Sequence, residues 1–189
     1  MKTTKQLITT ALFAALIFAA TFVIKIPIPV SGGYVHPGDS FVMMAGMLLG
    51  PVCGTLAAAV GSLLSDVIGG YVIYAPATAV IKGLIALCCY FALHAFERKN
   101  SSSHISYKNG DSSYVTKYKT NRILAITVCG IIDILFVVGG YFIYESLMFG
   151  VSAAIVSVIP NTMQGAFALV LTFILYPRLN QISTLLRKS

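Results

Sequence analysis

Long apolar runs occupy most of this chain and leave little sequence that could form a water-facing surface. Of the 189 residues, 57% are hydrophobic and only 10% are charged, whereas a soluble domain carries ~25% charged residues. A chain with this deficit has to be surrounded by lipid instead of water. Because a helix needs ~20 apolar residues to cross a bilayer, the length allows about six crossings and one polar loop.

The apolar runs predict an all-α membrane protein, a six-transmembrane-helix bundle that forms a single transmembrane domain over residues 1–189. Prolines and glycines interrupt helices, and they separate the early runs at 27–33, 50–51 and 69–70. Residues 97–121 are rich in Ser, Lys, Tyr and Asn and predict a polar loop. Pro160 predicts a kink in the last span. The second span is short, so a re-entrant segment is an alternative there. The expected spans cover about 7–26, 40–50, 52–69, 77–96, 122–142 and 151–176.

The positions of the basic residues predict the orientation. Eleven of the thirteen Lys and Arg residues lie in or next to non-apolar segments, and a cytoplasmic N-terminus places all eleven on one side. Segments rich in Lys and Arg stay in the cytoplasm. We therefore expect both termini and the 97–121 loop to be cytoplasmic, and the net charge of +7 does not indicate a nucleic-acid partner. The eleven residues, all expected outside the helices, are Lys2, Lys5, Arg98, Lys99, Lys108, Lys117, Lys119, Arg122, Arg178, Arg187 and Lys188.

Polar side chains gather toward the outer half of the predicted bundle. Asn161 and Gln164 are three residues apart and share one side of a helix. Their amides offer donors and acceptors suited to a heteroaromatic ring with hydroxyl or amine substituents. Five tyrosines in or near the outer-side connections belong either to an interfacial aromatic belt or to a platform that stacks on a planar ligand. They are Tyr34, Tyr71, Tyr74, Tyr141 and Tyr144. The candidate substrate-binding residues are His36, Asp39, Tyr74, Lys82, Glu145, Asn161 and Gln164.

Three ionisable residues at membrane depth have a structural interpretation as well as a functional one. Such groups are costly in lipid unless they are paired or line a wet cavity. Asp66 and Lys82 are expected to form a structural ion pair. Asp133 lies about halfway through the fifth span, where it is either protonated or bonded to a neighbouring helix, and a proton-coupling role stays open.

Small residues recur at a spacing of four along the first three spans. Such rows let helix backbones approach closely in lipid. The row that includes Gly46, Gly50 and Gly54 is interpreted as internal packing. The row formed by Ala11, Ala15 and Ala19 either packs internally or presents a smooth surface to another membrane protein.

The sequence lacks the motifs of several kinds of enzyme. The sequence contains no G-x-x-x-x-G-K-[ST], HExxH or GxSxG motif, so we expect no catalytic residue, no metal site, no cofactor and no ATPase activity of its own. If the protein moves a solute uphill, the energy comes from a partner or an ion gradient. The four cysteines lie inside apolar runs and are interpreted as inert thiols: Cys53, Cys88, Cys89 and Cys129.

The order of several short motifs resembles the substrate-binding S component of energy-coupling factor (ECF) vitamin importers. The similarity covers nearly the whole chain except the 97–121 loop. The residues that carry it are Gly33-Tyr34-Val35-His36-Pro37-Gly38-Asp39-Ser40, Leu48-Leu49-Gly50-Pro51, Gly61-Ser62, Ser65-Asp66, Tyr74-Ala75-Pro76-Ala77, Ile81-Lys82-Gly83, Asn161-x-x-Gln164 and the alanine repeat.

This resemblance implies a multi-pass protein of the cell membrane that binds one small vitamin near its outer face, under a lid formed by residues 27–38. It also implies a complex with a membrane-embedded coupling (T) subunit and two cytosolic ATPase subunits, which use the ATP. The Ala11, Ala15 and Ala19 face would contact the coupling subunit, and reorientation of the whole S component would deliver the solute. The branch looks closest to importers of pyridoxine or hydroxymethylpyrimidine, with riboflavin as a further candidate.

Two other functions compete with this one. A stand-alone secondary transporter would use Asp133 or Asp66 for proton coupling. A membrane enzyme or a structural assembly subunit is the third possibility, although the sequence offers the enzyme no nucleophile or metal set.

Overall fold

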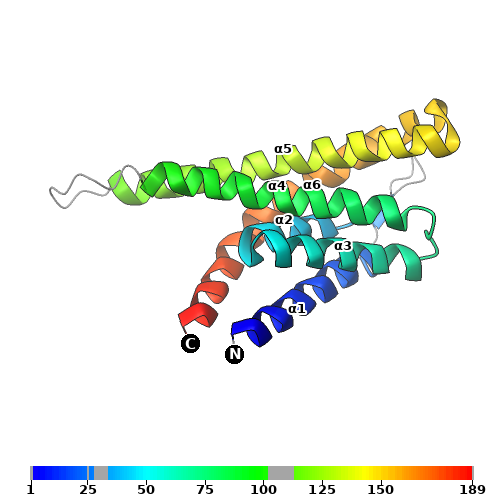
Figure 1. Cartoon of the computed structure of the whole chain (residues 1–189). Coiled ribbons are helices and arrows are strands. Elements are labelled where there is room, and N and C mark those ends of the chain that lie inside the picture. The colour runs from blue at the N-terminus through cyan, green and yellow to red at the C-terminus, as the bar shows by residue number, and fades with distance from the viewer. Residues whose placement is uncertain (1, 25, 28–33, 102–112, 189) are drawn as a thin grey trace.

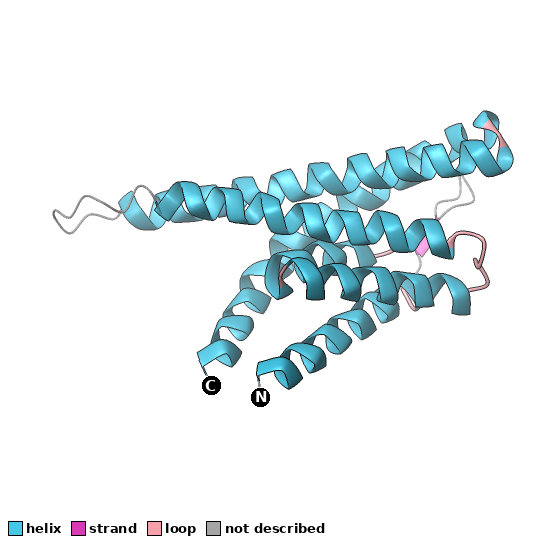
Figure 2. Ribbon diagram, in the orientation of Figure 1, coloured by secondary structure: helices cyan, strands magenta, loops and turns pink. Residues whose placement is uncertain are grey.

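The computed structural model describes residues 2–24, 26–27, 34–101 and 113–188, and nearly all of them are helical (Figure 2). The expected all-α, six-helix bundle is confirmed. Its one further element within the described residues is a short antiparallel pair of strands, β1 (Ile26–Pro27) and β2 (Tyr34–Val35). The helices are α1 (Lys2–Phe22), α2 (Gly38–Leu49), α3 (Pro51–Ile68), α4 (Ala75–Ser101), α5 (Ser113–Phe149) and α6 (Val151–Lys188).

The helices run back and forth between two ends of the molecule (Figure 1). One end carries both termini and the ends of α4 and α5 that flank residues 102–112. The other end carries the α3–α4 and α5–α6 turns. Successive helices pack against each other from α1 to α6, and α1 also packs against α3. Both termini therefore lie at the same end of the bundle, as an even number of passes requires.

Helix α2 is the centre of the bundle, because it contacts all five other helices. Ten of its 12 residues are buried, so its whole circumference is covered by protein. At ~1.5 Å per residue its length is ~18 Å, less than the ~30 Å of a hydrocarbon core. The other five helices are long and apolar enough to cross a membrane. A short helix can lie at this depth because its neighbours shield it from lipid.

Several helices are longer than the spans predicted from hydropathy. Helix α1 starts at Lys2 and ends at Phe22, four residues before the predicted end. The predicted 97–121 loop is wrong at both ends, since α4 runs to Ser101 and α5 begins at Ser113. Helix α6 continues through Pro160 and Pro177 to Lys188, and toward its C-terminus it turns away from α5 (Figure 1).

The expectation that the basic residues lie outside the helices is also wrong. Ten of the eleven fall within helical ends, and Lys108 lies outside the described residues. The physical reason is that helical hydrogen bonds form in water as well as in lipid. A helix can therefore continue past the apolar segment that crosses the membrane, and Lys and Arg are good helix formers.

Glycines allow the central helices to touch. A side chain at Gly46 would collide with the backbone of Ala86 on α4, and one at Gly54 would meet the carbonyl of Ala45 on α2. The interpretation of this row as internal packing is confirmed at these two positions. Gly50 has a different role, since it joins α2 to α3 with φ of +92°, a backbone conformation that favours glycine.

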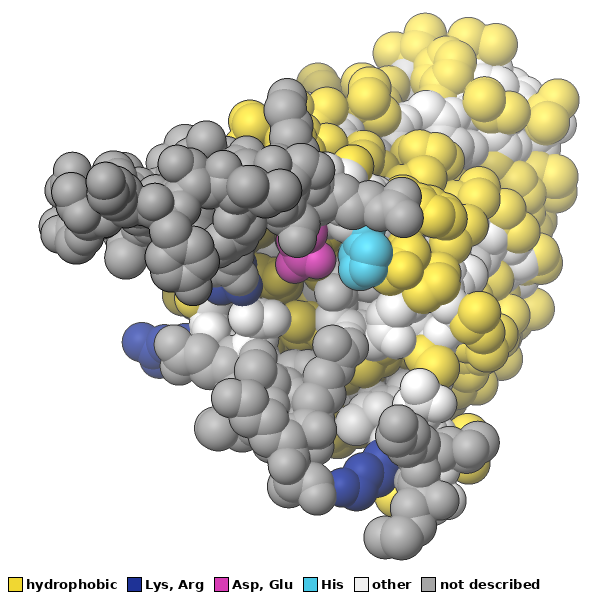
Figure 3. All heavy atoms as spheres, turned by 60° about the vertical axis from the view of Figure 1, so that its left-hand side comes forward, with side chains coloured by type: hydrophobic (Ala, Val, Ile, Leu, Met, Phe, Trp, Pro, Cys, Tyr) yellow, Lys and Arg dark blue, Asp and Glu magenta, His cyan; other side chains and the backbone are white. Residues whose placement is uncertain are grey.

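The flank of the molecule is apolar. Figure 3 shows hydrophobic side chains along the flank, and Lys and Arg side chains at the end that faces the viewer. Large hydrophobic residues are exposed on α1, α3, α4, α5 and α6, including Leu7, Val52 and Leu135. Lipid is the environment in which such a surface is stable.

Candidate functional site

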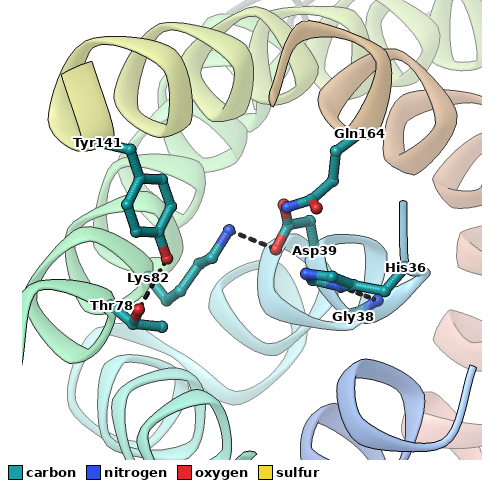
Figure 4. A network of polar contacts seen from close by, with 7 residues as sticks. All are labelled: His36, Gly38, Asp39, Thr78, Lys82, Tyr141 and Gln164. Carbon is teal, nitrogen blue, oxygen red and sulfur yellow. Dashed lines mark hydrogen bonds and ion pairs between the residues drawn. The ribbon is translucent and has the colours of Figure 1, made fainter. Parts of the chain in front are cut away.

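The centre of the candidate site is the carboxylate of Asp39, in the first turn of α2. Its Oδ1 lies 2.6 Å from the Lys82 ammonium of α4, and its Oδ2 accepts a 2.7 Å hydrogen bond from the Gln164 amide of α6. Figure 4 shows the three side chains converging from three helices. All are buried, with Asp39 only 1% exposed. Three of the predicted site residues, far apart in the sequence, therefore meet.

His36 lies beside this group, just before α2. Its Nδ1 accepts a 3.2 Å hydrogen bond from the Gly38 backbone N–H. Gly38 is tightly enclosed, because a side chain there would collide with Thr21 of α1 and with the His36 ring. The turn that positions His36 and Asp39 is thus fixed by packing against α1.

Lys82 is 2% exposed, and its ammonium lies 5.8 Å from the centroid of the Tyr141 ring on α5. This is within the ~6 Å range of a cation–π contact. The predicted Asp66–Lys82 ion pair is wrong, because Lys82 pairs with Asp39 instead. Asp39 and Asp66 lie toward the same end of the bundle, and the central position of α2 brings Asp39 to the Lys82 ammonium.

Two further residues of the network were not among the predicted site residues. The hydroxyls of Thr78 and Tyr141 lie 2.8 Å apart and link α4 to α5 (Figure 4). Thr78 precedes Lys82 by four residues, and Tyr141 precedes Glu145 by four, so each shares a helix face with a predicted residue. That spacing is the signal by which Thr78 could have been found, whereas Tyr141 is already among the five tyrosines singled out in the sequence.

A cluster of aromatic rings continues from Tyr141 toward the α5–α6 turn. The Tyr74 ring lies 5.8 to 6.3 Å from the rings of Tyr141, Tyr144 and Phe149, distances typical of aromatic pairs. The Tyr74 hydroxyl donates a 3.4 Å hydrogen bond to Glu145. Tyr74 precedes the α4 span, and burial together with the nearby Glu145 carboxylate raises the pKa of its phenol. The structure therefore brings Tyr74 and Glu145 together.

Asn161 differs from Gln164, although both were predicted as a pair. Gln164 is 6% exposed and bonds to Asp39. Asn161, one turn earlier, is only partly buried and takes no part in the polar contacts of this network within the described residues. Of the predicted pair, only Gln164 belongs to the buried group.

Asp133 of α5 is fully buried, at 0% exposure. Neither of its carboxylate oxygens has a hydrogen-bond partner within the described residues. The charged groups that act on it are Asp39 and Lys82, so it borders the same network. The described residues contain no group of three or more His, Cys, Asp or Glu side chains that could hold a metal ion.

The fold and the buried polar site define a multi-pass membrane protein. The sequence model of the family described as "ECF-type riboflavin transporter, S component" matches residues 1–181, so the chain belongs to the S components of ECF vitamin transporters, a transport family.

Two individual proteins are similar to this chain. A solved structure, titled "Structure and mechanism of the S component of a bacterial ECF transporter", has a TM-score of 0.54 and 22% sequence identity. The match covers 95% of this chain and 98% of that one, and it shows that the two share a fold. An "Uncharacterized protein in gap 3′region" of Pyrococcus woesei is 49% identical over 63 residues. Those residues are 33% of this chain, and the chain spans less than half of that relative, 42%.

Proposed function

We propose that this chain is the high-affinity solute-binding subunit of an ATP-driven importer for a small water-soluble vitamin or vitamin precursor. The observation that carries the proposal is the Asp39–Lys82–Gln164 group, which is charged, converges from three helices and is buried at membrane depth. Polar groups in this position mark solute pathways more often than structural supports. Pyridoxine or hydroxymethylpyrimidine is the proposed solute, because both carry hydroxyl groups and ring nitrogens that can bond to carboxylate, ammonium and amide groups. Riboflavin, which the family's description names, is the third candidate.

The energy for transport would come from partners. The sequence has no P-loop motif, so ATP hydrolysis is assigned to two cytosolic ATPase subunits. A membrane-embedded coupling (T) subunit would join them to this chain. Membership of the S-component family supports this division of labour.

Native mass spectrometry of the purified full chain tests the binding function. We expect one vitamin molecule per protein, either co-purified from rich medium or added from a panel of vitamins. Gln164→Ala should weaken binding, because it removes a donor to Asp39 and leaves one oxygen of that buried carboxylate without its hydrogen bond. The matched control is Thr162→Ala, since this exposed α6 residue bonds only to its own helix. Failure of the wild-type protein to bind any vitamin would overturn the proposal.

A stand-alone, proton-coupled secondary transporter is the second candidate. Asp133 favours it, because a buried acid without a hydrogen-bond partner is a typical proton carrier in transporters. Proteoliposomes that contain this chain alone distinguish the two functions. Uptake driven by a pH gradient and lost in Asp133→Asn supports the secondary transporter. Absence of uptake until the coupling and ATPase subunits are added supports the importer subunit.

The proposed orientation places both termini in the cytoplasm. The Lys and Arg residues near the ends of α1, α4, α5 and α6 support it, since those ends share one side of the bundle (Figure 1). A C-terminal fusion to green fluorescent protein should fluoresce, whereas a fusion to alkaline phosphatase should be inactive. The reverse pattern would mean that the solute site faces the cytoplasm.

A further inference from the structure

Two carboxyl groups of the buried network lie near one ammonium. Asp39, Lys82 and Asp133 act on one another, and the Lys82 ammonium forms its ion pair with Asp39. His36 also acts on Asp39, and its Nδ1 accepts the Gly38 N–H bond. Asp133 is therefore the second acid of the network.

Asp133 is the acid without a partner. Both oxygens of the Asp39 carboxylate have a partner, since Oδ1 pairs with Lys82 and Oδ2 bonds to Gln164. Neither oxygen of Asp133 is hydrogen-bonded within the described residues. Asp133 faces α6 next to Gln164, because a side chain built at Gly165 would place its Cβ 3.3 Å from the Asp133 Oδ2. The unpaired carboxyl thus borders the α6 turn that supplies Gln164 to Asp39.

A carboxyl group in this position is costly, because it has lost its water and gained no donor. Two additions would relieve that cost, a proton or a positively charged group of a ligand. We infer that the solute captured by this chain carries a basic nitrogen, an amine or a protonated heteroaromatic ring nitrogen, which bonds to Asp133. This inference rests on the proposed function and adds to it the chemical class of the solute.

The aromatic rings near Lys82 also suit a solute with a basic nitrogen. Tyr141 already lies under one cation, the Lys82 ammonium, and Tyr74 with Tyr144 extends the aromatic surface away from it. Aromatic faces attract cations. Glu145 adds a carboxylate beside Tyr74, and its Oε2 is buried without a hydrogen-bond partner in the described part of the chain.

Two matched pairs of probes test the inference on the purified full chain at pH 7. Pyridoxamine and pyridoxine differ only in an aminomethyl against a hydroxymethyl group. The second pair is 4-amino-5-hydroxymethyl-2-methylpyrimidine and its less basic 4-oxo analogue. Riboflavin serves as the neutral probe. We expect the tightest-binding probe to be the basic member of a pair, with an affinity at least ~10-fold above that of its partner, because charged hydrogen bonds are the strong ones.

The variant Asp133→Asn keeps the size of the side chain and removes its charge. It should reduce the preference within that pair to less than about twofold, mainly by weakening the basic member. Thr172→Val is the control, as this buried α6 hydroxyl bonds to Ala168 of its own helix, and it should leave the preference intact.

Three results would overturn the inference while the proposed function stands. They are tightest binding of riboflavin, no preference for the basic member of either pair, and a preference that Asp133→Asn leaves unchanged. A wild-type protein that binds none of these probes and no other vitamin overturns the proposed function, and the inference with it.

Discussion

The Asp39 carboxylate bonds to side chains of two other helices, Lys82 of α4 and Gln164 of α6. Asp39 is therefore the residue of the network at which a substitution should be most damaging. Its carboxylate offsets the Lys82 charge and uses the Gln164 amide. Taking a lysine out of water costs several kcal/mol, and an acid nearby recovers that cost only when the geometry is good. The 2.6 Å separation of the Lys82 and Asp39 atoms meets this condition.

Replacing Asp39 with alanine should therefore destabilise the protein strongly. Asp39→Ala leaves the buried Lys82 ammonium without its ion-pair partner, for which ~3–5 kcal/mol of unfolding free energy is the usual loss. The measurement is denaturant unfolding of the purified protein in mixed micelles. The double variant Asp39→Leu with Lys82→Met removes both charges and should recover most of the loss. An equally unstable double variant would show that packing at these positions, and not the ion pair, supports the fold.

The identity of the site residues could be predicted from sequence more readily than their pairing. Acids and bases in apolar runs stand out, so Asp39, Lys82 and Gln164 were found. The partner of Lys82 was wrong, since the choice between Asp39 and Asp66 depends on how the helices are rotated against each other. No local pattern contains that information. Asp133 also stands out in an apolar run, but its lack of a hydrogen-bond partner follows only from the positions of its neighbours in the structure.

Helix α2 shows what hydropathy detects and what it does not. Its residues are as apolar as a membrane span, so the sequence predicts a span over 40–50. The structure gives a 12-residue helix that is covered on all sides. At the ends of α4, α5 and α6 the opposite happens, because polar residues continue a helix beyond the apolar part. Hydropathy locates the segments that avoid water, whereas helix ends depend on caps, propensity and packing.

Close contact between α2 and α4 depends on Gly46. In Gly46→Ala, the added Cβ would collide with the Ala86 backbone, and a backbone cannot move aside as a side chain can. We expect a loss of ~1–3 kcal/mol in unfolding free energy, the usual cost of overpacking. Because α2 also carries Asp39, vitamin affinity should fall in the same variant.

Gly139 of α5 provides the matched control for this test. A Cβ at Gly139 would meet no heavy atom within 4 Å, so Gly139→Ala should be neutral or stabilise the helix by ~0.5–1 kcal/mol. The two substitutions are chemically identical and both lie inside helices. Equal effects on unfolding would mean that close approach of α2 to α4 is not what Gly46 provides.

At the scale of the whole molecule, two helices are packed on few sides, α1 and α6. Within the described residues, α1 contacts only α2 and α3 among the helices, and α6 contacts only α2 and α5. On α1, Ala11, Ala15 and Ala19 are all exposed. The sequence leaves two roles open for this alanine row, internal packing or contact with another membrane protein, and the exposure of all three alanines argues against internal packing. An exposed row of small residues in lipid suits a helix of another membrane protein, since small side chains permit close backbone contact.

We therefore propose that this alanine face of α1 binds the coupling subunit, and Ala15→Trp tests it. The indole would hold the two backbones apart, so co-purification with the coupling and ATPase subunits should be lost. Vitamin binding by the isolated chain should persist, because the face lies outside the polar network. Leu135→Trp is the control: Leu135 is 65% exposed on α5, which α1 does not contact, and the complex should survive. An intact complex in Ala15→Trp would exclude this face as the contact. Loss of vitamin binding in the isolated variant would instead show that α1 supports the solute site.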